Sequence, residues 1–109
     1  MTDTTKVLAQ VTPAATTLTT LYTVPAATST VVSSIVICNQ SGAQITFRIS
    51  IQIAAAADNA KQYLYYDLPL LGNDTFIATI GVTLATTDVI KVYANGTSVS
   101  FSAFGVEVT

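Results

Sequence analysis

Six carboxylates are the main side chains that could carry acid–base chemistry. Histidine is absent, and Cys38 is the only cysteine in the 109 residues. General acid–base catalysis needs a group that titrates near the working pH, and histidine supplies it most often. Four aspartates fall in or beside predicted turns, where aspartate commonly accepts backbone N–H groups: Asp58, Asp67, Asp74 and Asp88. We therefore expect turn-capping aspartates and no enzyme.

Motifs that bind metals or cofactors are also missing. The sequence contains no EF-hand spacing, zinc pattern, phosphate-binding loop or nucleophile elbow. Asn73-Asp74 together with Asp88 is a weak candidate for calcium, which needs several converging oxygen ligands. Cys38 ends the apolar run Val31–Cys38, where a lone thiol usually behaves as a small buried hydrophobe. We expect no cofactor and no metal.

Three tyrosines lie close together in the segment from position 61 to 67. If this segment is a strand, Tyr63 and Tyr65 face one way and Leu64, Tyr66 and Leu68 face the other. An exposed tyrosine pair suits a subunit interface or a sugar platform, because each ring offers apolar area with a polar tip. The alternative is ordinary cross-strand packing with the hydroxyls in water. Between an interface and a sugar site, the absence of tryptophan favours the interface.

The composition points to association rather than chemistry. Half of the residues are hydrophobic, only 9% are charged, and the formal net charge is -2. The surface must therefore consist mostly of neutral groups, which oppose contact with a neighbour only weakly. Four basic residues cannot follow a phosphate backbone, so we expect no nucleic-acid partner. No apolar run is long enough for a membrane helix and no signal peptide is visible, so we expect a soluble protein made in a cytoplasm.

Strand patterns dominate the chain. Between Gln44 and Ile53, apolar and polar residues alternate without exception, which predicts a strand with one wet face. Similar segments recur about every ten residues. They are Lys6–Val11, Leu18–Val24, Thr30–Cys38, Gln62–Leu71, Thr75–Leu84, Val89–Ala94 and Thr97–Val108. We predict a single all-β domain, an antiparallel β-sandwich of about eight strands, jelly-roll or immunoglobulin-like.

The connections carry turn signals. Asn95-Gly96 predicts a two-residue type I′ hairpin, because Asn and Gly best tolerate the positive φ that both central positions need. Residues 39–42 and 72–74 also read as turns. Ala54–Ala60 lacks alternation and contains good helix formers, so it could hold one helical turn.

The last segment changes phase. Val99 and Phe101 share one face of the strand, whereas the later apolar residues share the other: Phe104, Val106 and Val108. A bulge or kink near Ala103 to Gly105 would reconcile the two sets. Alternatively, the strand is apolar on both sides because it packs against a second subunit. We favour the bulge.

Residues 1–17 precede the clear strand pattern of the domain at 18–109. They contain Thr and Ala clusters and Pro13, and they could form a mobile arm or an edge strand. Such an arm would have apolar side chains to bury against a partner. We take as candidate contact residues Lys6, Val7, Leu8 and Val11, together with Tyr63 and Tyr65.

Five stretches between roughly Leu18 and Glu107 matter through their order along the chain. They are Leu21-Tyr22-Thr23-Val24-Pro25, Ser33-Ser34-Ile35-Val36-Ile37-Cys38-Asn39, Tyr65-Tyr66-Asp67, Asn73-Asp74-Thr75-Phe76 and Val99-Ser100-Phe101-Ser102-Ala103-Phe104-Gly105-Val106-Glu107. In this order they resemble small β-sandwich structural proteins of tailed bacteriophage virions.

The resemblance implies a structural role in the virion. Such proteins include capsid decoration (cement) proteins, often trimers that clamp neighbouring major capsid subunits. The expected partners are thus the major capsid protein and further copies of this chain, on the capsid surface after synthesis in the host cytoplasm. Two alternatives stay open: a tail, neck or fibre module, and a carbohydrate-binding module that uses Tyr63 and Tyr65.

Overall fold

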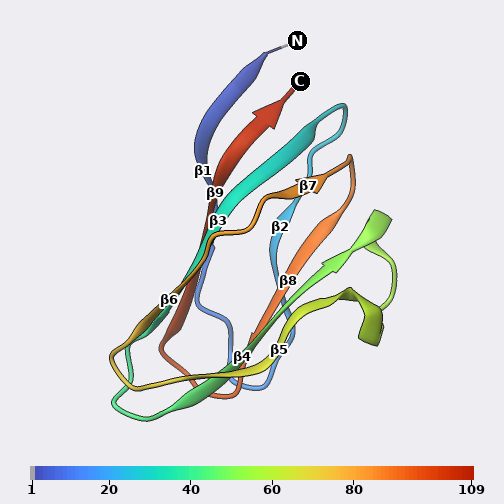
Figure 1. Cartoon of the computed structure of the whole chain (residues 1–109). Helices are drawn as coiled ribbons and strands as arrows, with labels where there is room; N and C mark the ends of the chain where they lie inside the picture. The colour runs from blue at the N-terminus through green and yellow to red at the C-terminus, as the bar shows by residue number, and fades with distance from the viewer. Residues whose placement is uncertain (1) are drawn as a thin grey trace.

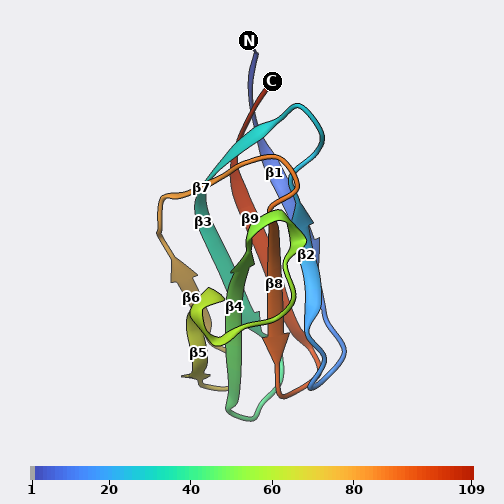
Figure 2. The same cartoon turned by 90° about the vertical axis from the view of Figure 1, so that its right-hand side faces the viewer.

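The computed structural model describes residues 2–109, which form two antiparallel sheets packed face to face (Figures 1 and 2). The first, sheet A, has the order β1-β9-β3-β6, and β7 also pairs with β3. Its strands are β1 (Asp3–Val11), β9 (Val99–Val108), β3 (Ser29–Asn39), β6 (Thr75–Ala78) and β7 (Val82–Leu84). The second, sheet B, has the order β2-β8-β4-β5. Its strands are β2 (Thr19–Thr23), β8 (Val89–Ala94), β4 (Ile45–Gln52) and β5 (Tyr63–Leu70).

The predicted antiparallel β-sandwich is confirmed. The segment Thr75–Leu84 is divided into β6 and β7, which both lie along β3 and act as one interrupted strand. With this pair counted once, the chain passes between the sheets at every connection except the one from β4 to β5. Sheet A then places the first strand beside the last. This strand order is that of a jelly roll.

The core forms where the inward-facing side chains of the two sheets meet. The strand predicted from alternation is β4, and its residues Ile45, Phe47 and Ile49 are buried. The ring of Phe47 packs against Phe76 and Phe101, with centroids 5.6 and 6.3 Å away. Buried aromatic pairs at such separations add to the gain from burial alone. β4 of sheet B is thus packed against two strands of sheet A.

The predicted hairpin at Asn95-Gly96 is wrong. β8 ends at Ala94 in sheet B and β9 begins at Val99 in sheet A, so residues 95–98 cross between the sheets. Gly96 does not have a positive φ, whereas Ser98 does, at 62°. Asn95 is held by β4 instead, because its N–H donates to the Thr46 carbonyl and its Oδ1 accepts the Thr46 N–H.

The β4–β5 connection contains two single-turn 3₁₀ segments, Ile53–Ala55 and Ala60–Gln62. Helical turns therefore occur at the two ends of the predicted Ala54–Ala60 segment rather than through it. The second turn is capped by Asn59, whose side chain accepts the Lys61 N–H at 3.2 Å. Asparagine at this position satisfies a donor that the turn itself leaves free.

The predicted bulge in the last strand is also wrong in detail. β9 alternates without interruption, with Val99, Phe101, Ala103 and Gly105 buried. The extra residues lie on its two neighbours, between Val7 and Ala9 of β1 and between Val32 and Ser34 of β3. Gly105 explains the irregularity on β3, because a Cβ there would lie 2.1 Å from the Val31 carbonyl oxygen. Phe104 and Val106 consequently point away from the core.

Candidate functional site

The outer face of sheet A carries a group of apolar side chains. Directly paired residues in antiparallel strands point to the same face, so the register identifies the group. Phe104 pairs with Val7, Val106 pairs with Val31, and Val36 pairs with Ile77. We call these six residues the sheet A patch. They come from β1, β9, β3 and β6, so the patch crosses the full width of the sheet.

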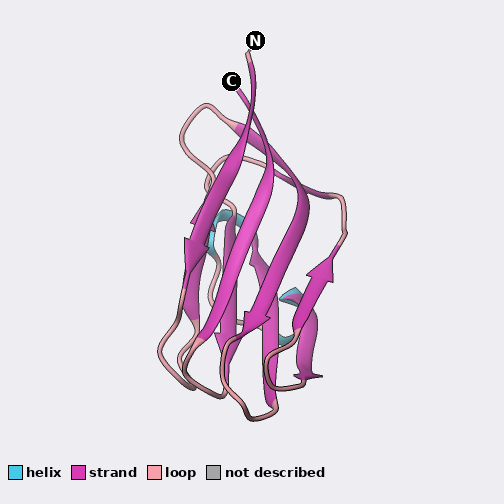
Figure 3. Cartoon of the chain, turned by 90° about the vertical axis from the view of Figure 1, so that its left-hand side faces the viewer, coloured by secondary structure: helices cyan, strands magenta, loops and turns pink. Residues whose placement is uncertain are grey.

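The sheet A patch is open to its surroundings. Val7, Val31 and Ile77 are 50%, 41% and 60% exposed. Phe104, Val36 and Val106 are half-buried by their neighbours within the sheet. Figure 3 shows this face from outside, and no other described segment crosses in front of β1, β9 and β3. Six apolar side chains gathered on one face of a sheet mark an interaction site more often than scattered single residues do.

Charge is distributed unequally between the two outer faces. Of the ten charged residues, only Asp3, at the start of β1, occupies an outward position on the strands of sheet A. By contrast, Arg48 and Lys91 point outward from the strands of sheet B, and Asp67 also lies on that sheet. The patch is bordered instead by neutral residues, such as Thr5, which pairs with Val106. Contact with the outer face of sheet A would therefore desolvate almost no charge.

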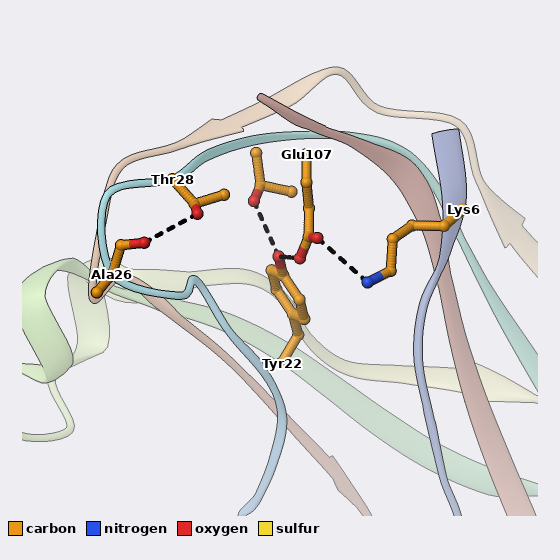
Figure 4. A network of polar contacts seen from close by, with 6 residues as sticks. Lys6, Tyr22, Ala26, Thr28 and Glu107 are labelled. Atoms are coloured by element: carbon orange, nitrogen blue, oxygen red, sulfur yellow. Dashed lines mark hydrogen bonds and ion pairs between the residues drawn. The ribbon is translucent and has the colours of Figure 1, made fainter. Parts of the chain in front are cut away.

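Lys6 belongs to a polar network between the sheets (Figure 4). Its Nζ lies 3.1 Å from Oε1 of Glu107, and Oε2 of Glu107 accepts a hydrogen bond from the Tyr22 hydroxyl. The Tyr22 hydroxyl also lies 2.9 Å from Oγ1 of Thr30. Burial, with the hydrogen bond to Glu107, raises the pKa of Tyr22 to about 12. The Tyr22 hydrogen bond, with Lys6, lowers the pKa of Glu107.

The other predicted contact residues on β1 divide between the two sides of the strand. Val7 is part of the sheet A patch, whereas Leu8 and Val11 are partly buried against the core. β1 is the edge strand of sheet A, and its pairing with β9 runs from Asp3 to Val11. The N-terminal segment is therefore fixed in the sheet.

The predicted pairing of Tyr63 with Tyr65 is wrong. Register shifts between β4 and β5 insert extra residues into β5, and they break the alternation on which that prediction depended. Tyr65 packs against Phe47 and Phe76, with centroids 6.1 and 5.6 Å away, next to the core. Tyr63 instead meets Tyr66 edge to face, with centroids 5.1 Å apart. The two tyrosines of β5 that contact each other are therefore Tyr63, which is half-buried, and Tyr66, which is exposed.

Arg48 joins this tyrosine pair to β8. Its guanidinium carbon lies 4.1 Å from the ring centre of Tyr66 and 4.2 Å from that of Tyr93. Nε and Nη2 of Arg48 also donate to the two carboxylate oxygens of Asp67, at 2.6 and 3.2 Å. These contacts fix the guanidinium plane. We call Arg48, Tyr63, Tyr66 and Tyr93 the tyrosine–arginine cluster.

An open depression of about 460 Å³ adjoins the tyrosine–arginine cluster, lined by Arg48, Asp58, Ala60, Tyr63 and Tyr66. The Tyr63 hydroxyl donates to Oδ1 of Asp58 at 2.9 Å and fixes that carboxylate at the edge of the depression. Partial burial and this hydrogen bond raise the pKa of Tyr63. The Arg48 hydrogen bonds lower the pKa of Asp67 and raise that of Arg48. Both members of this ion pair therefore stay charged near neutral pH.

The four aspartates act in separate places. Asp74 accepts the Thr75 N–H, and Asp88 accepts the N–H groups of Ala54 and Ala85, as expected of turn residues. Asp58 and Asp67 bind side chains instead. Asp74 precedes β6 and Asp88 precedes β8, at opposite ends of the sandwich, so the calcium candidate is not assembled (Figure 1). Within residues 2–109, no three histidine, cysteine or acidic side chains lie close enough to hold a metal ion.

Over the described residues there is no helix whose length and apolar character would let it cross a membrane. No family model matches the chain, and no curated protein matches it closely enough to count as a relative. The sheet A patch and the tyrosine–arginine cluster therefore have to be interpreted from their own geometry.

Proposed function

We propose that this protein is a structural subunit that binds its neighbours through the outer face of sheet A, as a decoration (cement) protein on the outside of a phage head. One observation carries the proposal: a jelly-roll domain leaves uncovered a face that carries six apolar side chains and almost no charge. The order of sequence segments that resembles phage virion proteins supports the choice of a phage head. The partners would be the major capsid protein and two further copies of this chain.

Burial of this face would gain free energy from its apolar side chains and lose little hydration of charged groups. Apolar surface gains roughly 25 cal/mol per Å² when it is buried, whereas a charged group loses hydration that only a good partner restores. The sheet A patch offers apolar surface to bury and contains no charged group that would lose its hydration. Thr5, Gln10 and Ser102 lie beside it on the same face and can form the polar rim of an interface.

The area needed is modest. A stable interface buries about 800 Å² on each partner, which is roughly one seventh of the 5514 Å² accessible surface of this chain. One face of a sandwich measuring 45 × 28 × 20 Å can supply that area. A subunit that binds only the assembled shell stabilises it by mass action, and many copies multiply the effect.

The fold agrees with this role but does not determine it. Jelly rolls are found in viral capsid proteins and in lectins, so this strand order is compatible with either use. Because one fold supports many functions, the function must be inferred from the surface.

The test compares two exposed apolar positions on opposite sheets. Val31 is 41% exposed in the sheet A patch, and Leu64 is 46% exposed on β5. We expect purified protein to sediment as a trimer and to rebind phage heads stripped of their outer proteins. Val31→Glu should abolish both properties because it buries a charge, whereas Leu64→Glu should retain both. A monomer that ignores stripped heads, or equal behaviour of the two variants, would contradict the proposal.

The copy number in purified virions separates a head protein from a tail, neck or fibre module. Quantitative mass spectrometry should find hundreds of copies for each virion if the protein decorates the head. A count of a few to dozens would assign it to the tail and overturn the cement role.

A further inference from the structure

The geometry points to a second binding site, on the outer face of sheet B, that takes a neutral sugar ring. The site is the depression beside the tyrosine–arginine cluster. Its volume of about 460 Å³ falls within the range of small-molecule sites, roughly 300–1,000 Å³. This site does not overlap the sheet A patch, so the inference is independent of the proposed function.

The depression offers an aromatic surface. Tyr66 is 60% exposed, although Arg48 stacks on it and Tyr63 meets it edge to face. A ring left so exposed contributes little to the core, and it presents a flat apolar surface with a polar tip. The C–H face of a pyranose ring is flat and apolar in the same way. Stacking of the two would remove both surfaces from water.

Two polar groups stand beside this ring with bonding capacity to spare. Among the described residues, Asp58 accepts only through Oδ1, which leaves Oδ2 for a ligand. Arg48 uses Nε and Nη2 for Asp67, and Nη1 keeps its hydrogens. A carboxylate and a guanidinium that line one depression suit the hydroxyl groups of a sugar, which donate and accept hydrogen bonds at once.

These polar groups are held in position before any ligand arrives. Asp58 is fixed by the Tyr63 hydroxyl, and the guanidinium is fixed by two rings and one carboxylate. A site that is already ordered loses less conformational entropy on binding.

The charges select a neutral ligand. The two carboxylates of Asp58 and Asp67 oppose an anion such as a phosphate or an acidic sugar. Arg48, which lies against the face of Tyr66, opposes a cation there. A neutral hexose therefore fits better than a nucleotide, a uronic acid or a quaternary ammonium group.

The affinity of one site should be weak. For a ligand the size of one hexose, ordinary ligand efficiency gives a Kd on the order of 1 mM. Several copies on one assembly would bind a polysaccharide more tightly through multivalency. This favours a surface rich in repeating neutral sugars as the natural target.

The experiment is an amide NMR titration of the whole protein with neutral tetrasaccharides of glucose, galactose and mannose, each to about 20 mM, which exceeds the expected Kd. We expect saturable shifts at Arg48, Asp58, Tyr63 and Tyr66 with at least one of them. Tetragalacturonate and tetramethylammonium should bind about tenfold more weakly or not at all. No shift at the cluster with any neutral sugar, or stronger binding of either charged probe, would overturn the inference.

Variants separate binding from a structural role. Tyr66→Ala should weaken the sugar by about tenfold, the loss usual for one stacked ring. Leu64→Ala, on the same strand but outside the depression, should leave the affinity unchanged. Asp58→Asn alters an exposed side chain in the connection and should weaken binding without unfolding the protein, even if Tyr66→Ala impairs folding. Unchanged affinity in both Tyr66→Ala and Asp58→Asn would show that the cluster only stabilises the sheet.

Discussion

Asn39, the last residue of β3, ties two loops at one end of the sandwich together. Its side chain is fully buried. Nδ2 donates to the carbonyl oxygens of Ala43, Leu71 and Leu70 at 2.8, 3.1 and 3.3 Å. Oδ1 accepts the N–H of Ser41 at 3.0 Å and its hydroxyl at 2.7 Å. Replacement by alanine would remove all of these bonds from a place that water does not reach.

The loss can be estimated from the geometry. An amide nitrogen has two hydrogens, so Nδ2 counts as two bonds, and the Ser41 N–H adds a third. The Ser41 hydroxyl lies 3.1 Å from the Ala43 carbonyl and can donate there instead, so its bond is not counted. At about 1 kcal/mol for each bond, Asn39→Ala should lower the free energy of unfolding by about 3 kcal/mol. In a domain of this size the melting temperature should fall by roughly 15 °C.

Urea unfolding followed by circular dichroism measures this loss, and an unchanged m-value shows that the unfolded state is the same. Asn59→Ala is the matched control, because Asn59 caps a short exposed turn and should cost no more than about 1 kcal/mol. A loss below about 1 kcal/mol for Asn39→Ala, or equal losses for the two variants, would refute the reasoning.

Three further predictions concern single positions. Glu107→Gln should lower the free energy of unfolding by about 1 kcal/mol near pH 7. Because the folded pKa of Glu107 is lowered, this difference should persist above pH 4.5 and disappear as the pH falls through the folded pKa, which a series of thermal melts can follow. Gly105→Ala should cost about 3 kcal/mol in urea unfolding because the new Cβ would collide with the Val31 carbonyl, whereas Gly81→Ala meets nothing within 4 Å and should be nearly neutral; similar losses for both would contradict the collision. Ser50→Ala should raise the free energy of unfolding by about 1 kcal/mol, and with it the melting temperature, because Oγ of Ser50 is buried without a partner among the described residues. A lower melting temperature would mean that this hydroxyl forms a hydrogen bond in solution.

Local pattern was enough to predict the strands. In β4, the alternation of Ile45, Phe47 and Ile49 with polar residues determined which side faces the core, because successive strand residues point to opposite faces. Turn residues bounded the other strands, and the predicted bounds differ from the observed ones by a few residues. The interruption between β6 and β7 was not predicted, since both halves have strand-like sequences.

Side-chain partners on neighbouring strands could not be predicted from the same pattern. Tyr66 meets Tyr63 only because β5 contains extra residues relative to β4, and nothing in the order of the tyrosines reveals such a shift. Arg48 and Tyr93 complete the cluster from β4 and β8, which are far apart in the sequence. The sequence therefore indicated a tyrosine pair near position 63, but it paired the wrong two.

The chain's composition and periodicity by themselves determined an all-β sandwich with a largely uncharged surface. Strand periodicity can be read from short segments, and charge content can be read from the amino-acid composition. Only the tertiary structure decided on which face the few charged residues lie and in which direction the apolar side chains outside the core point. Phe104 and Val106 indicated a change of phase in the sequence, yet burial along β9 alternates without such a change and both residues point outward. The reason is that the extra residues lie on β1 and β3, and the register between strands distant in sequence is set by packing.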